Sequence, residues 1–105
     1  TMVVVSTEFG RTVAVNGTHG TDHGTGACML FAGGALAKMQ QSDSKLKGGK
    51  VQGIWPGLSK EKLFDQRDLM PTSDVREWLA HSVSAHWQLN ATQIKTIFPD
   101  LPSLN

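Results

Sequence analysis

The hydrophobic pattern of the chain contains two short runs of consecutive apolar residues. Residues 2–5 are methionine and valine, residues 27–32 are all apolar, and neither run alternates with polar residues. Such runs are typical of strands that are buried on both faces of a parallel sheet. We therefore expect two buried strands. A central parallel strand needs neighbours on both sides, and few later segments have a strand pattern, so we expect the natural polypeptide to begin well upstream.

The clearest helical pattern covers residues 74–89. Its apolar residues recur near the spacing of one helix face, and Pro71 lies just ahead of the start, outside the helix interior that it would disrupt. Thr72, Ser73 or Asp74 is expected to cap this helix, which we expect to pack over the two strands. The apolar face comprises Val75, Trp78, Leu79, Val83 and Trp87.

A second, shorter helix is predicted directly after the first. Asn90 followed by Gln93 resembles a capping box, Ile94 and Ile97 continue the helical spacing, and Pro99 ends the element. The predicted fold class is therefore α/β, with a few buried strands and a C-terminal helix pair.

The remaining segments have the composition of loops. Residues 6–26 are rich in glycine, threonine, asparagine and histidine and are expected to form a long irregular loop. Residues 38–49 are polar and are expected to extend into solvent. A short strand is expected at residues 50–54, before a turn at Trp55-Pro56-Gly57.

Charge and cysteine content narrow the classes of function. The 105 residues include 10 lysines and arginines and 9 aspartates and glutamates, giving a net charge of +1, which offers no basic surface for nucleic acid or an anionic membrane. No apolar run approaches the roughly 20 residues that cross a bilayer. Cys28 is the single cysteine, so an intrachain disulfide and a cysteine-rich zinc site are excluded, and we expect it to pack in the core.

The strongest candidate for chemistry is the glycine-rich stretch of residues 17–24, together with Glu8 just before it. Asp22 and His23 lie side by side in this stretch, and carboxylates and imidazoles are the ligands of oxygen and nitrogen metal sites. The surrounding glycines allow the backbone turns by which such ligands converge. The alternative is a polar surface loop whose aspartate and histidine stabilise turns.

Two further sets of polar residues have structural alternatives. Glu8 and Arg11 either form an ion pair or lie near a ligand site, because ligands of open α/β sheets bind outside the carboxyl ends of the strands. His81 and His86 lie in the predicted helix, where we expect solvated or partly packed side chains rather than ligands.

Four segments are distinctive when taken together. They are Val3-Val4-Val5-Ser6-Thr7-Glu8-Phe9-Gly10-Arg11-Thr12, the pair Asp22-His23, Trp55-Pro56-Gly57-Leu58, and Arg67-Asp68-Leu69-Met70-Pro71-Thr72-Ser73-Asp74-Val75-Arg76. In this order they resemble a bacterial family known mainly as domain of unknown function 1501, nearly collinearly from Thr1 to about Pro99.

Members of that family are several hundred residues long and are often exported by the twin-arginine pathway. The resemblance therefore implies that residues 1–105 are a single C-terminal segment of a larger α/β domain in a periplasmic or secreted protein. Its expected partner is the missing N-terminal part of the same polypeptide. Without that part, we expect self-association through the surfaces that it covers.

That family is similar in turn to the alkaline phosphatase and sulfatase superfamily, which places metal ligands at strand ends. Val3 to Gly10 resembles the strand that ends there in Ala-Asp-His-Gly, so Glu8 and Phe9 stand where aspartate and histidine bind metal. His23-Gly24 resembles the superfamily's His-Gly element, and residues 68–72 resemble its Asp-x-x-Pro-Thr element at the start of the C-terminal helix. The fold implied is the C-terminal part of an alkaline phosphatase-like fold.

The resemblance also implies a site and a reaction. Glu8, Asp22 and His23 would contribute to binding zinc, manganese or calcium in the full-length protein, a hydrolase of phosphate or sulfate esters whose nucleophile lies upstream. This chain alone would be catalytically incomplete. The alternative is a non-catalytic binding or assembly protein that keeps the fold and has lost the metal site, and Phe9 favours it because phenylalanine cannot coordinate a metal.

Overall fold

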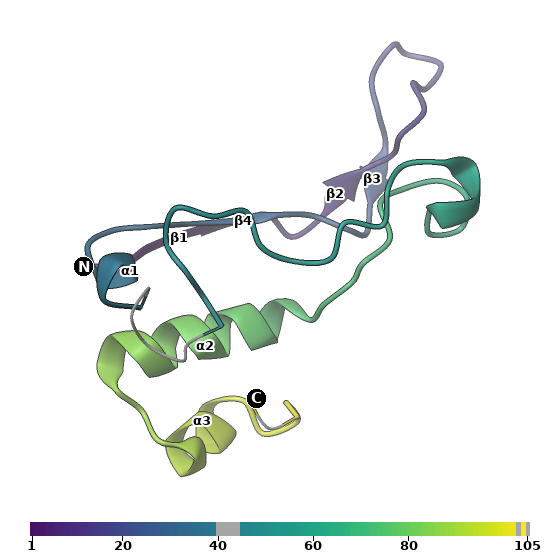
Figure 1. Ribbon diagram of the computed structural model, residues 1–105. Coiled ribbons are helices and arrows are strands. Elements are labelled where there is room, and N and C mark those ends of the chain that lie inside the picture. Colours follow the sequence, from purple (N-terminus) through teal and green to yellow (C-terminus); the bar gives the residue numbers. More distant parts are fainter. Residues whose placement is uncertain (40–44, 103, 105) are drawn as a thin grey trace. The chain divides into compact units, whose positions relative to one another are not determined.

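The computed structural model describes residues 1–39, 45–102 and 104. Within them the chain is a small α/β fold with few strands (Figure 1). The strands and helices follow in the order β1 (Val3–Ser6), β2 (Gly10–Arg11), β3 (His23–Gly24), β4 (Met29–Ala32), α1 (Ala35–Met39), a 3-10 helix (Lys60–Lys62), α2 (Val75–Trp87) and α3 (Ala91–Ile97).

The two predicted strands form, and they pair with each other. β1 and β4 make a two-stranded sheet, but the expectation that both are buried is wrong. Val3, Val5 and Leu30 are 51%, 54% and 64% exposed. The physical reason is that, among the described residues, no further strand adjoins this pair. All of β1 and alternate residues of β4 therefore stay in solvent.

The expectation of a long irregular loop over residues 6–26 is only partly right, because strand pairing interrupts it at residues 10–11 and 23–24. β2 and β3 form an antiparallel hairpin in which Gly10 pairs with Gly24 and Arg11 pairs with His23. The polar composition concealed the hairpin because its strands are only two residues long. The short strand expected at residues 50–54 does not form.

The chain divides into two compact units. Unit 1 comprises Thr1–Val3, Phe31–Gln52 and Ser73–Asn105, and unit 2 comprises Val4–Leu30 and Gly53–Thr72. The core of unit 1 consists of Leu36, Met39 and Leu46. Residues 38–49 were expected to be solvated, but Met39 and Leu46 are buried because they supply this core; residues 40–44 lie outside the described part. Partly buried neighbours of the core are Met2, Phe31, Ala35, Trp78 and Ala85.

Helix α2 begins where the sequence predicts and ends at Trp87, two residues before the predicted end at Leu89. Asp74 is the N-cap, and its side chain accepts a hydrogen bond of 2.9 Å from the backbone N–H of Arg76. Gln88 ends the helix in the left-handed conformation with φ of 55°. The predicted apolar face is only partly right, since Val75 and Trp87 are exposed and the buried positions are Ala80, His81 and Ser82.

Helix α3 confirms the capping prediction. The Asn90 side chain accepts a hydrogen bond of 3.0 Å from the backbone N–H of Gln93, and the backbone N–H of Asn90 donates one of 2.9 Å to the Gln93 side chain. Two otherwise unpaired N–H groups of the first turn are satisfied in this way. Among residues 1–39, 45–102 and 104, no helix is both long and apolar enough to span a membrane.

The segments of unit 2 pack against one another at glycines, where backbone atoms come into close contact. A Cβ atom placed on Gly10 would lie 1.7 Å from the carbonyl oxygen of Gly26, and one on Gly26 would lie 2.4 Å from that of Leu69. A Cβ atom on Gly24 would lie 2.8 Å from the Cβ of Asp68. Because glycine lacks this atom, the hairpin and residues 68–69 approach one another more closely than side chains would allow.

Candidate functional site

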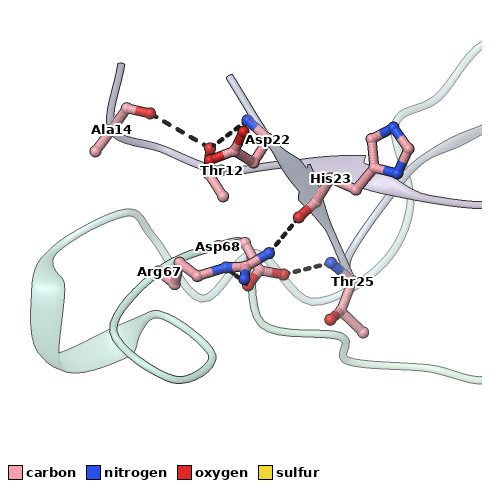
Figure 2. Close-up of polar contacts among 7 residues, drawn as sticks. All are labelled: Thr12, Ala14, Asp22, His23, Thr25, Arg67 and Asp68. Atoms are coloured by element: carbon pink, nitrogen blue, oxygen red, sulfur yellow. Dashed lines mark hydrogen bonds and ion pairs between the residues drawn. The ribbon is translucent and has the colours of Figure 1, made fainter. Parts of the chain in front are cut away.

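The candidate site is built where the β2–β3 hairpin meets the segment around Asp68. The backbone N–H of Thr12 donates to the carbonyl of Asp22 at 3.0 Å, extending the hairpin beyond β2 and β3. The backbone N–H of Val13 donates to the carbonyl of Arg67, also at 3.0 Å, and Thr12 forms an isolated antiparallel bridge with Asp68. These bonds hold residues 67 and 68 against the hairpin (Figure 2).

Asp68 is the buried carboxylate of this arrangement, with only 2% of its surface exposed. It accepts a hydrogen bond from the backbone N–H of Thr25, and the Nε of Arg67 lies 3.6 Å from its Oδ1. A buried carboxylate is stable when it is hydrogen-bonded and lies close to a cation. Asp68 meets both conditions, so it joins Thr25 and Arg67 into one polar cluster.

Arg67 also fixes the main chain of His23. Its Nη2 donates a hydrogen bond to the His23 carbonyl oxygen, as Figure 2 shows. Together, Arg67 and Asp68 hold the backbone on both sides of Gly24, one at His23 and the other at Thr25. The position of His23 is therefore set by residues more than 40 positions later in the chain.

The His23 side chain stacks on Phe9. The two ring centroids are 3.7 Å apart and the ring planes are inclined by 17°. Stacking covers a face of the imidazole, whereas both ring nitrogens lie in the ring plane and direct either a lone pair or an N–H outward from its edge. His23 remains exposed as a residue, so the stack restrains its ring without burying it.

Asp22 is held by a turn centred on Asn16. The Asn16 Oδ1 accepts hydrogen bonds from the Thr18 backbone N–H at 3.0 Å, the Thr18 hydroxyl at 2.9 Å and the Gly20 backbone N–H at 3.0 Å. Its Nδ2 donates to Asp22 Oδ1 at 2.9 Å. On the other side, the Thr12 hydroxyl accepts from the Asp22 backbone N–H at 3.0 Å and donates to the Ala14 carbonyl at 3.3 Å.

The predicted ligands lie in different parts of this unit. Asp22 and His23 are neighbours at the start of β3, and Glu8 is exposed in the segment between β1 and β2. The alternative of a Glu8–Arg11 ion pair is not among the ion pairs of the described residues. Within the described part, no three histidine, cysteine, aspartate or glutamate side chains gather closely enough to hold a metal ion.

The donor types nevertheless fit a metal of the zinc or manganese class. Carboxylate oxygen from Asp22 and imidazole nitrogen from His23 are ordinary ligands of these ions. The hydrogen bond from Asn16 to Asp22 is of the kind that orients a ligating carboxylate. By donor type alone, Asp22 and His23 are compatible with a share of such a site.

Cys28 corrects one expectation. It was expected to pack in the core, but it is a free, exposed cysteine just before β4. The reason is the one that leaves Leu30 in solvent: the β1–β4 pair has no covering layer among the described residues.

Three residues of the site were missed as functional candidates from the sequence. Phe9 was noted only as unable to bind metal, and Arg67 and Asp68 only as part of a family-like segment. Arg67 lies in a turn and Asp68 in isolated bridges, so neither carries a local pattern that predicts its role. Their contacts with His23 and Thr25, 44 and 43 positions away, required the fold.

Comparison with known proteins identifies the family. A family model described as a protein of unknown function, DUF1501, matches residues 1–98. Neither the curated proteins nor the solved structures contain a match to this chain.

Proposed function

Because the chain belongs to the DUF1501 family of proteins of unknown function, we propose that its β2–β3 hairpin contributes metal ligands to a hydrolase of phosphate or sulfate esters. The proposed fold of the whole domain is alkaline phosphatase-like, with this chain as its C-terminal segment. The observation that carries the proposal is the exposed residue His23, whose main chain is anchored by Arg67 and whose ring is stacked on Phe9.

Each proposed ligand has a definite task. His23 offers a ring nitrogen, and Asp22 offers a carboxylate oxygen whose orientation is set by Asn16. Glu8 offers a second carboxylate from the segment that follows β1. A bound zinc, manganese or calcium ion would stabilise the negative charge that develops on an ester oxygen during displacement.

The site proposed is shared with the preceding part of the same polypeptide, which would supply the remaining ligands and the nucleophile. The exposed valines of β1 support this partner, because an apolar strand that is open on both faces is suited to the interior of a larger sheet. The resemblance of the Glu-Phe-Gly-Arg-Thr segment to exported proteins supports a periplasmic or secreted location.

The test uses the full-length polypeptide and measures metal content and ester hydrolysis together. We expect one or two tightly bound metal equivalents in the wild type. His23→Ala should lower the affinity more than about 100-fold, beyond the 10- to 100-fold typical of residues that only support a ligand, and should abolish turnover of phosphate and sulfate esters.

His19→Asn is the matched control, because His19 is an exposed histidine in the same loop. Its φ of 61° is one that asparagine tolerates, so the variant should bind metal as the wild type does. If His23→Ala retains both metal and turnover, the proposal is wrong.

A non-catalytic binding or assembly protein is the second candidate. It is favoured by Phe9, an apolar side chain where superfamily relatives have a ligand, and by the exposed apolar strands β1 and β4. A full-length wild type that is folded, free of bound metal and inactive towards both ester classes would favour this candidate over the hydrolase.

A further inference from the structure

The His23 main chain is fixed from two directions. Within the hairpin, His23 pairs with Arg11, and from outside the hairpin Arg67 donates a hydrogen bond to its carbonyl oxygen. The next anchored group is the Thr25 N–H, which donates to the buried carboxylate of Asp68. The Cα–Cβ direction of His23 is therefore set before any ligand arrives.

The ring is fixed by a different residue. An exposed histidine ordinarily samples several side-chain rotamers, and ordering it costs conformational entropy. Phe9 lies two residues before Arg11, which pairs with His23 in the antiparallel register. Phe9 and His23 are therefore diagonal neighbours on one face of the ladder, within reach of each other's rings. The near-parallel stack at 3.7 Å selects the imidazole orientations that keep this contact.

We propose that Phe9 is a positioning residue that holds the His23 imidazole with its nitrogen edge set to receive a metal ion. This inference rests on the proposed function of His23 and extends it. Phe9 takes no part in coordination. It lowers the ordering cost of binding, since a ligand already restrained in its bound orientation loses less freedom when the metal arrives.

The first arm of the test needs no metal. In an NMR spectrum of the full-length protein, the carbon-bound ring protons of His23 should be shifted upfield by the ring current of Phe9. Phe9→Leu keeps an apolar side chain of similar size but removes the ring, so the shift should vanish. Phe9→Trp restores an aromatic ring and should restore an upfield shift. His23 ring protons without such a shift in the wild type would overturn the stack itself.

The second arm measures zinc affinity by titration of the full-length protein. We expect Phe9→Leu to weaken zinc binding about 10-fold, the lower end of the range for residues that orient a ligand, and Phe9→Trp to recover most of the loss. Phe98→Leu, the same substitution in unit 1, is the matched control and should bind zinc like the wild type.

The outcomes separate the two ideas. A wild type that binds none of zinc, manganese and calcium removes the proposed function and the positioning role with it. If the wild type binds zinc and His23→Ala does not, but Phe9→Leu binds as tightly as the wild type, only the positioning role is wrong. Phe9→Tyr guards against a folding defect in the leucine variant, because it retains the ring and should match the wild type in both arms.

Discussion

The two units of this chain differ in the kind of internal packing that stabilises each of them. Unit 1 has a core of aliphatic and methionine side chains, Leu36, Met39 and Leu46, with partly buried residues of α2 packed against it. In unit 2 the most deeply buried side chain is a carboxylate, Asp68, and its segments meet through glycines and backbone hydrogen bonds.

This difference explains why the candidate site lies in unit 2. An apolar core fixes side chains by close packing, whereas glycine contacts and backbone hydrogen bonds fix the main chain itself. A ligand such as His23 benefits from a main chain that is fixed before binding. The comparison predicts that the two units respond to different kinds of substitution.

The largest effect is expected from Gly10→Ala. The added Cβ would lie 1.7 Å from the Gly26 carbonyl oxygen, so backbone must move, and we expect unit 2 to lose about 3 kcal/mol or more, the upper part of the range for overpacking. Gly17→Ala is the control, because a Cβ there meets nothing within 4 Å. Hydrogen exchange of amides in residues 10–26 measures both. Equal protection in the two variants would contradict packing through bare backbone.

The second effect is expected from Leu46→Ala in unit 1. Leu46 is 4% exposed in the core, and leucine-to-alanine changes at such sites cost about 2 to 5 kcal/mol; we expect about 2, because so small a core can collapse around the gap. Val51→Ala, at a fully exposed position of the same unit, should change stability by less than about 0.5 kcal/mol. Denaturant unfolding followed by far-UV circular dichroism, which reports the helices of unit 1, compares them. Equal losses would remove the assigned core.

Local sequence patterns predicted where the helices and strands form better than they predicted which side chains are buried. The cap at Asp74 and the capping box at Asn90 depend on a few neighbouring residues, so the sequence was sufficient to place α2 and α3. The burial of β1 depends on what covers its faces, which no local pattern contains. Leu46 was missed because a single apolar residue within a polar stretch has no periodicity by which to recognise it.

The candidate site was predictable in part for the same reason. Asp22 and His23 were named as candidate ligands from their residue types and the flanking glycines, which are local properties. The β2–β3 hairpin was missed because strands of two residues give no alternation to detect. The roles of Phe9 and Asp68 depend on contacts between distant segments. Those contacts form only in the folded chain, where the glycines let the segments approach, so the sequence alone does not reveal them.

Unit 1 also buries polar side chains, and one of them, the histidine of α2, can titrate. His81 is buried in α2, and its Nε2 has no hydrogen-bond partner among the described residues. Burial lowers the pKa of His81 below its ordinary value, and the nearby positive charge of Lys45 lowers it further, while Glu77 opposes the shift. The folded chain therefore favours a neutral imidazole at this position.

The smallest effect, and the most specific to unit 1, is the pH dependence that His81 confers. As pH falls through about 6.5, the ordinary histidine value, the unfolded chain takes up a proton at this position while the folded chain does not, so stability is lost on acidification. The loss levels off below the folded pKa, where both states are protonated.

His81→Leu removes the titrating group and should flatten this part of the profile. Denaturant unfolding of both proteins between about pH 8 and pH 5 measures the difference, with the values at about pH 8 isolating the change in packing. An identical slope in the two proteins would mean that His81 is protonated as readily in the folded chain as in the unfolded one, and that the interior of unit 1 is more open to solvent than its buried side chains indicate.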